Sequence, residues 1–377
     1  MHVLEPVFED VEVAPGNRTT YSSFIELGGD RVLHGFTNFV KWTASEEDVE
    51  KLAADSEEAD RIRAGKALIP QISGRISADR GRSWGDRFTL YPSLVRGSDA
   101  VSFLRIPSGR ILMIIGMVGY RYWIDNRPFC CFSDDEGKTW SDPTYIGFLK
   151  PVWHNILHDS LIQLQSGRLI LPVSWTVDYE KTQTENFKSA ALISDNGGMS
   201  WRRGKGYTNC RESTAGVPEP RIVELRDGRL LMFMRTHDTG RMARAFSDDE
   251  GETWSEAELF LENAQAPCTL KRVPGRDEII LVWSHEPGKN LNQREVLNIA
   301  ASRDEGESWD REWYLEEYHS GRRYGYATVI FLGEETWVSY YYSDQEKDRG
   351  KILKLKIFAT SQLLTLTDRS SLPGSNA

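Results

Sequence analysis

The sequence predicts an all-β fold, a six-bladed β-propeller with a helical insertion in its first blade. Two repeated motifs and their spacing predict it. An eight-residue turn motif occurs five times, and a glycine between apolar segments occurs six times. The spacing leaves room for about four short strands per repeat, the content of one propeller blade. Residues 1–367 are expected to form this single domain, and residues 368–377 a disordered tail.

The turn motif has the form S-x-[DN]-x-G-x-[ST]-W, and its copies begin at intervals of 53 to 61 residues. They start at Ser77, Ser133, Ser194, Ser247 and Ser302. Ser and Asp side chains accept hydrogen bonds from nearby backbone N–H groups, glycine supplies a position with positive φ, and Trp opens the next strand. The motif therefore predicts a tight turn between two strands. An aspartate-lined metal site at each turn is the less favoured alternative.

The second motif is a glycine between two apolar segments, which is typical of two short strands joined by a tight turn. It is clearest around Gly109, Gly167 and Gly228, looser around Gly275, and weakest near Gly29 and Gly333. The four middle copies each lie 19 to 27 residues before a turn motif, which predicts two further strands in each repeat.

The first repeat is longer than the others, because 48 residues separate Gly29 from Ser77. The excess, about residues 44–66, carries apolar residues close to helical spacing, so we expect a helical insertion there. It would serve as a lid, a partner surface or a solvated decoration. Residues 2–13 alternate enough to form a strand, which is expected to complete the last blade and remove an exposed edge.

Composition and charge exclude several classes of protein. The 377 residues carry a net charge of −10 and contain no apolar run of about 18 residues, which argues against nucleic-acid and membrane partners. The four cysteines lack metal-ligand spacing and do not suit a disulfide framework. No metal or cofactor is therefore expected. The N-terminal segment does not resemble a secretory signal, which predicts a cytoplasmic protein, or a secreted one if a signal has been removed.

Polar residues recur nine positions before the anchor glycines, where each repeat should begin its innermost strand near the propeller axis. This phase selects Ala100 beside Asp99, His158 beside Asp159, Glu219, Ala266 beside Gln265, and Tyr326 in the last repeat. Ionisable residues at positions that apolar residues would fill predict a site on the axis. A wet central channel is the alternative.

With its five turn motifs, the chain resembles the sialidase (neuraminidase) superfamily, whose repeats are called aspartate boxes or BNR repeats. The segment from Glu219 to Arg235 is similar to the family pattern E-x-x-x-V-E-L-x-D-G-x-L-L-M-x-x-R. Arg294 stands eight residues before Ser302, and Tyr326 follows 32 residues after Arg294, as the family spacing requires. The resemblance implies that Tyr326 is the nucleophile and Glu219 its base. It also implies that Arg235 and Arg294 bind a substrate carboxylate.

Two features depart from the family pattern. The family's first carboxylate-binding arginine lies in a Phe-Arg-Ile-Pro motif, whereas the similar segment here, residues 104–107, is out of phase. Arg18 occupies the matching phase of the first repeat. The family's acidic Asp would fall where the insertion stands, which leaves the general acid open between Asp99, His158 and Asp159. Asp159 is also a candidate substrate contact.

These residues predict an exo-acting, retaining glycoside hydrolase of a carboxylate-bearing sugar, such as sialic acid, with a Tyr nucleophile. For Tyr326 and Glu219 the structural alternatives are core packing and a buried ion pair with a residue such as Arg221. Two other functions stay open. One is a glycosidase or lyase of another sugar that uses His158, and the other is a non-catalytic carbohydrate-binding propeller. The sequence leaves the oligomeric state undetermined.

Overall fold

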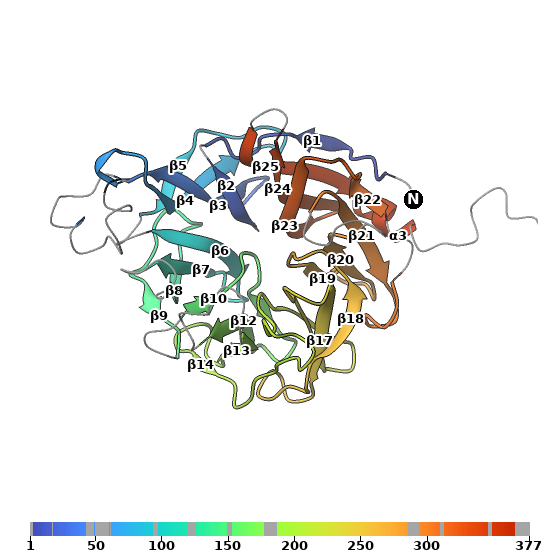
Figure 1. Ribbon diagram of the computed structural model, residues 1–377. Coiled ribbons are helices and arrows are strands. Elements are labelled where there is room, and N and C mark those ends of the chain that lie inside the picture. The colour runs from blue at the N-terminus through green and yellow to red at the C-terminus, as the bar shows by residue number, and fades with distance from the viewer. Residues whose placement is uncertain are drawn as a thin grey trace, which may run out of the picture.

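The computed structural model describes residues 3–16, 18–42, 49, 60, 62–92, 97–118, 126–148, 153–176, 187–285, 294–309, 313–345 and 349–365. Within these ranges the regular structure is almost entirely β, with one short C-terminal helix, α3 (Thr360–Thr365). The strands form five sheets placed around a central axis, so the fold is all-β and propeller-like (Figure 1).

Four of the sheets are four-stranded and antiparallel. The first contains β2 (Thr19–Glu26), β3 (Val32–Lys41), β4 (Leu68–Ser77) and β5 (Phe88–Tyr91). Another contains β15 (Arg221–Glu224), β16 (Leu230–Met234), β17 (Arg241–Ser247) and β18 (Glu258–Glu262). The next contains β19 (Thr269–Arg272), β20 (Ile279–Trp283), β21 (Leu297–Ser302) and β22 (Trp313–Glu316). The last contains β23 (Arg322–Leu332), β24 (Glu335–Asp344), β25 (Arg349–Ala359) and β1 (Phe8–Asp10).

The remaining sheet is nine-stranded and joins two antiparallel groups. Its strands are β6 (Ser98–Arg105), β7 (Ile111–Val118), β8 (Asn126–Ser133), β9 (Thr144–Tyr145), β10 (Trp153–Asn155), β11 (Ile162–Gln163), β12 (Leu169–Thr176), β13 (Lys188–Ser194) and β14 (Arg202–Arg203). The groups meet where β10 pairs antiparallel with β12 and, at one position, parallel with β8. Because this sheet is continuous, the count of six blades stays a prediction.

The N-terminal strand belongs to the C-terminal sheet, as the alternation of residues 2–13 predicts. β1 pairs antiparallel with β25, and Leu4, ahead of β1, is buried against β21 and β24 residues. Val13, after β1, is buried between the first and last sheets. The two ends of the chain are therefore held together by both a strand ladder and apolar packing.

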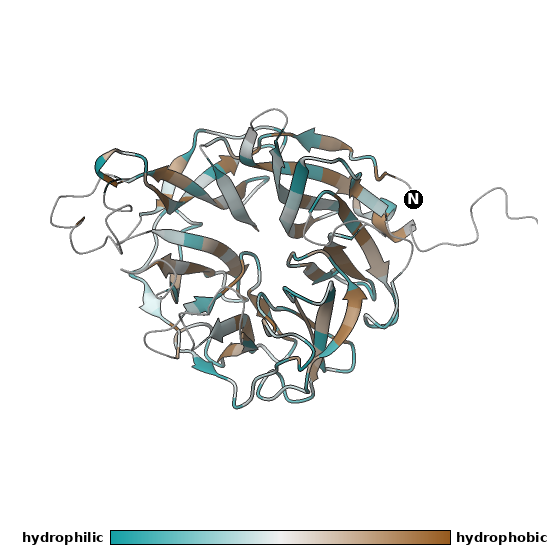
Figure 2. Ribbon diagram, in the orientation of Figure 1, coloured by the Kyte–Doolittle hydropathy of each residue, from teal (hydrophilic) through white to brown (hydrophobic). Residues whose placement is uncertain are grey.

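Apolar side chains fill the spaces between neighbouring sheets, and hydrophobic residues fall on the strands (Figure 2). Phe24 and Phe36 of the first sheet, for example, pack in one cluster with Trp337 and Leu353 of the last sheet. Each sheet thus buries both of its faces, which brings the first strands of the sheets to the axis.

The five turn motifs fold as predicted. In each, the Ser hydroxyl accepts a hydrogen bond from the Gly N–H at 2.7–2.9 Å, and the Asp or Asn side-chain oxygen accepts from a backbone N–H four residues on at 2.8–2.9 Å. Hydrogen bonds to Ser83 and Thr139 lower the pKa of Asp79 and Asp135, respectively, to about 2. These carboxylates therefore hold the turns.

The predicted insertion at 44–66 lies mostly outside the described residues, as does the tail at 368–377. Val49 and Ile62, two described residues of the insertion, are buried against Trp42. The helical insertion itself stays a prediction. No described helix is long and apolar enough to cross a bilayer.

Candidate functional site

The residues that begin the inner strands share a strained backbone conformation. Five non-glycine residues have φ between 49° and 56° at this point: Tyr21, Ala100, Asp159, Glu219 and Tyr326. A positive φ is rare for such residues, and it persists only where the surrounding structure offsets its cost in energy. Residues of this kind are concentrated at functional sites. The phase predicted from the glycine repeat is therefore a real structural position in most repeats, with Asp159 rather than His158 on it in the third. In the fifth repeat, Ala266 does not have a positive φ.

Three of these residues, each from a different sheet, meet at the axis. The Tyr326 hydroxyl donates a hydrogen bond to Glu219 Oε1 at 2.8 Å. The Tyr21 ring packs edge-on against Tyr326, with 4.8 Å between ring centroids. Tyr326 and Glu219 are both buried, with 8% and 7% of their surface exposed. The structure thus brings together the two residues that the family pattern assigns as nucleophile and base.

Arg235 completes this group by binding the second oxygen of the same carboxylate. Its Nη1 lies 2.8 Å from Glu219 Oε2, whereas its buried Nε has no hydrogen-bond partner in the described structure. Burial alone would raise the pKa of Glu219, but Arg235 and Arg294 outweigh it and hold that pKa below its usual value. Glu219 is therefore ionised at neutral pH and able to accept a proton.

Arg221 does not form the alternative ion pair with Glu219. Its guanidinium is buried and donates instead to the backbone carbonyls of His158, Asp159 and Cys268, at 2.6–3.2 Å. It thereby links the segment before β11 to the segment before β19.

Tyr326 is held in its neutral form. Burial and the nearby Glu219 raise the pKa of Tyr326 to about 12, against the opposing effect of Arg294 and Arg235. The phenol therefore needs a base to become a nucleophile, and Glu219 is in contact with it.

Arg294 lies over the Tyr326 ring. Its guanidinium carbon is 5.3 Å from the ring centroid, its Nε donates to the Gln265 carbonyl at 2.9 Å, and its Nη1 donates to the Tyr341 hydroxyl at 3.4 Å. The backbone of the residue pair Gln265–Ala266, also selected by the repeat phase, thus orients this arginine. Two fixed guanidinium groups next to the Tyr–Glu pair suit a carboxylate ligand.

Asp99 lies at the start of β6, next to the strained Ala100. Burial raises the pKa of Asp99 to about 7, and its Oδ1 has no hydrogen-bond partner within the described ranges. It faces Gly116, where a methyl group would come within 2.5 Å of that oxygen. A carboxyl group that is half protonated near neutral pH has the property a general acid requires.

His158 and Asp159 are bound to protein groups beneath Tyr326. The fully buried His158 ring lies 6.0 Å from the Tyr326 ring, and its Nε2 is 3.3 Å from the Ala327 carbonyl oxygen. Burial, followed by the charge of Arg221, holds the pKa of His158 well below its usual value. Asp159 binds Lys271 at 2.9 Å and accepts from the Ser23 hydroxyl at 3.3 Å.

Arg18 and the out-of-phase arginine have different surroundings. Arg18 is exposed, with its guanidinium 4.5 Å from the centroid of the Phe39 ring, and its charge acts on Lys351. Arg105, from the segment similar to Phe-Arg-Ile-Pro, binds Glu136 of the second turn motif at 2.8 Å.

Sequence reasoning missed Tyr21, Tyr341 and Lys351. Tyr21 was within reach, because it lies eight residues before Gly29, as Asp159 lies eight residues before Gly167. Tyr341 and Lys351 come from β24 and β25, the second and third strands of their sheet, to which the inner-strand phase does not apply.

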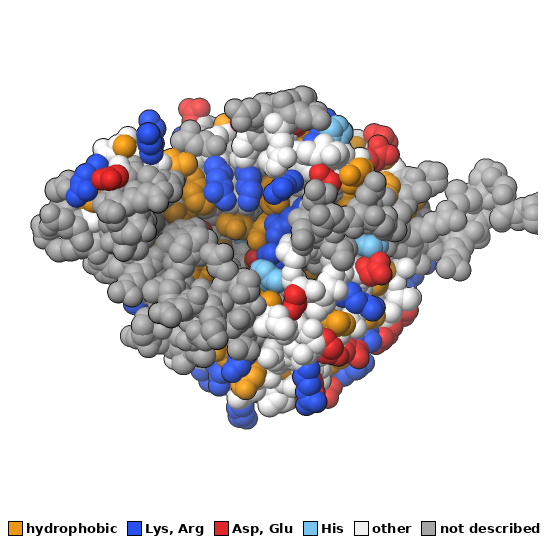
Figure 3. All heavy atoms as spheres, viewed as in Figure 1, with side chains coloured by type: hydrophobic (Ala, Val, Ile, Leu, Met, Phe, Trp, Pro, Cys, Tyr) orange, Lys and Arg blue, Asp and Glu red, His pale blue; other side chains and the backbone are white. Residues whose placement is uncertain are grey.

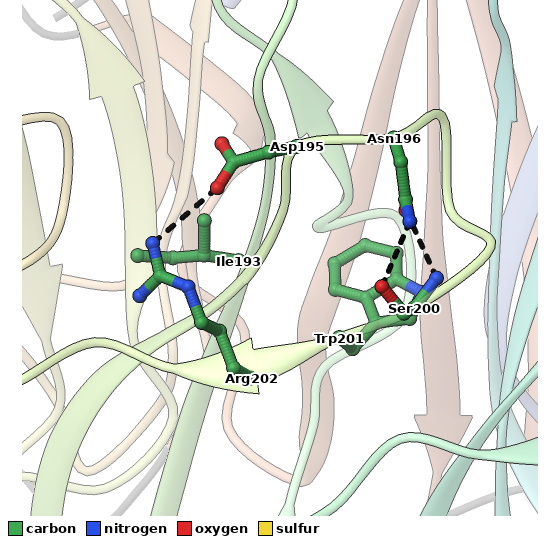
Figure 4. Close-up of a pocket in the computed structure, with 6 residues that line it drawn as sticks. All are labelled: Ile193, Asp195, Asn196, Ser200, Trp201 and Arg202. Atoms are coloured by element: carbon green, nitrogen blue, oxygen red, sulfur yellow. Dashed lines mark hydrogen bonds and ion pairs between the residues drawn. The ribbon is translucent and has the colours of Figure 1, made fainter.

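The centre of this face is hollowed, and Lys and Arg side chains line one side of the hollow (Figure 3). A separate small pocket of about 160 Å³ lies at the third turn motif (Figure 4). There Asp195 pairs with Arg202 at 3.3 Å and Asn196 binds Ser200, so its polar groups satisfy one another.

A propeller-like fold with five aspartate boxes and a central Tyr–Glu–Arg cluster defines a protein of the sialidase (neuraminidase) superfamily. The model of the BNR repeat-like domain matches residues 71–337, more than half of the chain, and the chain belongs to that family.

Relatives found by sequence comparison support membership of the same family. A sialidase of Bacteroides fragilis is 27% identical over 262 residues, which cover 64% of this chain and 46% of the relative. The chain spans less than half the length of the curated relatives it matches. Two solved structures are similar in fold. A Dyadobacter fermentans protein of unknown function has a TM-score of 0.71, 16% identity and coverage of 94% and 98% of the two chains. The intramolecular trans-sialidase of Ruminococcus gnavus has a TM-score of 0.67 and 15% identity, and the match covers 95% of this chain and 97% of that one.

Proposed function

We propose that this protein is a sialidase-type enzyme that cleaves the terminal glycosidic bond of a carboxylate-bearing sugar through a covalent Tyr326 intermediate. The observation that carries the proposal is the 2.8 Å hydrogen bond from the buried Tyr326 hydroxyl to Glu219, whose other oxygen is held by Arg235. A ring of six four-stranded blades, with the 44–66 insertion beside the first, is the architecture we propose around this site.

The choice of tyrosine follows from the charge of the substrate. A sialoside carries its carboxylate on the reacting carbon, so a carboxylate nucleophile would be repelled. A neutral phenol avoids this repulsion and becomes nucleophilic only as Glu219 removes its proton. Arg235 and Arg294 would bind the substrate carboxylate, since guanidinium groups stay charged and match carboxylate geometry.

Two steps complete the reaction. In the first, the Tyr326 oxygen attacks the anomeric carbon, Glu219 takes the phenolic proton, and the bond to the leaving oxygen breaks as Asp99 protonates it. In the second, an acceptor hydroxyl attacks the same carbon, gives its proton to Asp99, and releases Tyr326, which regains its proton from Glu219. Two inversions at one carbon give net retention.

The acceptor in the second step decides between two related activities. The Bacteroides fragilis relative is named a sialidase and the Ruminococcus gnavus structure an intramolecular trans-sialidase. Water gives the first activity, and a hydroxyl of the bound sugar gives the second. Both share the Tyr326 step. The alternative with His158 as a catalytic group gains no support, because that ring is fully buried and its Nε2 faces a backbone carbonyl.

The test is turnover of aryl glycosides of sialic acid, 2-keto-3-deoxy sugars, uronic acids and neutral sugars. Tyr326→Phe and Glu219→Gln are expected to lower kcat by about 10²–10⁴-fold on the acidic substrate, the usual contribution of a positioned proton-transfer group. Tyr207→Phe, at an exposed tyrosine, is the matched control. NMR of the first product should show retained configuration. Undiminished turnover by Tyr326→Phe would overturn the proposal.

A further inference from the structure

Lys351 lies one aromatic ring away from the nucleophile. It stands near the start of β25, and its Nζ is 4.8 Å from the centroid of the Tyr341 ring. The Tyr341 ring is in turn 5.9 Å from that of Tyr326, and its hydroxyl accepts a hydrogen bond from Arg294. The lysine ammonium group therefore belongs to the same cluster as the proposed carboxylate-binding arginine.

The charges that face Lys351 are all positive. They come from Arg18 ahead of β2, Arg294 ahead of β21 and Arg323 on β23. Among the described residues, no carboxylate pairs with Lys351, Arg18 or Arg323, and the acid at the end of β24, Asp344, is bound by Arg322 at 3.4 Å. Burial and these three arginines lower the pKa of Lys351 to about 8. Lys351 is half-buried, lies next to these arginines and is paired with no carboxylate among the described residues, so it is placed to receive an anion.

The first sheet supplies no charge at its own inner-strand position. Tyr21 occupies that position and packs its ring against Tyr326. Positive charge in this part of the molecule therefore comes from β25, which carries Lys351, and from the segment before β2, which carries Arg18.

We propose that Lys351 is a substrate-binding residue that holds the sugar carboxylate together with Arg294. This inference rests on the proposed function, and it adds a cation that the family pattern does not assign. Its chemical consequence is specific, because a lysine ammonium can lose its charge within the working range of the enzyme and an arginine cannot. Affinity for acidic sugars should fall as pH rises through about 8, the pKa of Lys351.

Binding of free acids separates this role from catalysis, because no bond is broken. We would measure Kd by calorimetry between pH 6 and 9.5 for sialic acid, 2-keto-3-deoxyoctonic acid and glucuronic acid. The methyl ester of whichever binds would be the uncharged control. The chains compared are wild type, Lys351→Gln, Lys351→Arg and, as a matched control at an exposed lysine of the second turn motif, Lys138→Gln. Thermal melts would establish that each variant is folded.

The expected result has three parts. Lys351→Gln weakens binding of the acid about tenfold at pH 6.5, within the range of one charge-assisted hydrogen bond, and leaves binding of the ester unchanged. Wild type and Lys138→Gln lose affinity above pH 8. Lys351→Arg retains affinity at pH 6.5 and shows no loss above pH 8.

Two results would overturn the inference, and they are distinct. If wild type binds an acid and Lys351→Gln binds it equally well at every pH, the role of Lys351 is wrong and the proposed function stands. If wild type binds none of the acids and turns over no acidic glycoside, the proposed function fails and this inference fails with it.

Discussion

At the scale of single residues, the central pair of the site consists of two side chains whose pKa values are moved in opposite directions by burial and by neighbouring charges. Glu219 has a lowered pKa because two arginines outweigh its burial, and Tyr326 has a raised one because burial and Glu219 act together. The pair therefore combines a charged carboxylate, the proposed base, with a neutral phenol, the proposed nucleophile, at the same pH. Such a difference in pKa between neighbouring groups determines which group donates a proton and which accepts it.

Asp99 gives a prediction at this scale. As a general acid it works protonated, so activity should be full below its pKa of about 7 and should fall tenfold per pH unit above it. The loss applies to kcat/KM for substrates with a poor leaving group, such as a natural disaccharide. Aryl substrates with an activated leaving group need no acid and should not show this fall.

The comparison of Asp99→Asn with wild type checks the assignment. The variant should lose about 10²–10⁴-fold on the disaccharide and much less on the aryl substrate. Equal losses on both substrates would place Asp99 in binding or folding instead.

At the scale of elements, the turn motifs do more than reverse the chain. The glycine of each motif faces a residue of a neighbouring repeat. A methyl group added at Gly81 would strike Trp337, at Gly198 Leu112 and at Gly306 Leu231, at 2.4–2.9 Å. Glycine is therefore required both for its positive φ and for the close approach of one sheet to the next.

Two glycines with the same φ of 86° separate these contributions. Gly228 has no atom within 4 Å of an added methyl group, whereas at Gly306 the buried Leu231 side chain would be 2.6 Å away. Gly228→Ala should cost only the backbone strain, about 1–2 kcal/mol. Gly306→Ala should cost about 1–3 kcal/mol more, through overpacking. Urea unfolding of both variants measures the difference, and equal losses would show that the sheets yield to the methyl group.

At the scale of the whole molecule, the fold depends on bringing the ends of the chain together. β1 completes the C-terminal sheet, and apolar clusters join each sheet to the next, including the last to the first. The site uses this arrangement directly, since Glu219 and Tyr326 lie 107 residues apart in the sequence and come from different sheets.

Substitutions at Leu4 and Val7 test whether the packing of the N-terminal segment stabilises the fold. Leu4 is 4% exposed in an apolar cluster beside β24, whereas Val7 is 57% exposed. Leu4→Ala should lower the free energy of unfolding by about 2–5 kcal/mol, and Val7→Ala by less than about 0.5 kcal/mol. The measurement is denaturant unfolding followed by Trp fluorescence. A small effect of Leu4→Ala would mean that the N-terminal segment is not needed to hold the ends together.

The sequence by itself determined what is local and periodic: the five turns, the strands around them, and the phase at which inner strands begin. Its resemblance to the sialidase pattern also indicated the Tyr326, Glu219, Arg235 and Arg294 set, because the spacing of these residues matches that of the family. A turn is encoded by hydrogen bonds within eight residues, so it can be recognised without knowing the rest of the fold.

Only the tertiary structure decided which side chains meet. It paired Glu219 with Arg235 rather than Arg221, buried His158 against a backbone carbonyl, and placed Lys351 over the Tyr341 ring. The physical reason is that periodicity fixes where a residue lies along its own strand. Contact and charge depend instead on how neighbouring sheets pack and on burial, which are set by residues far away in the chain.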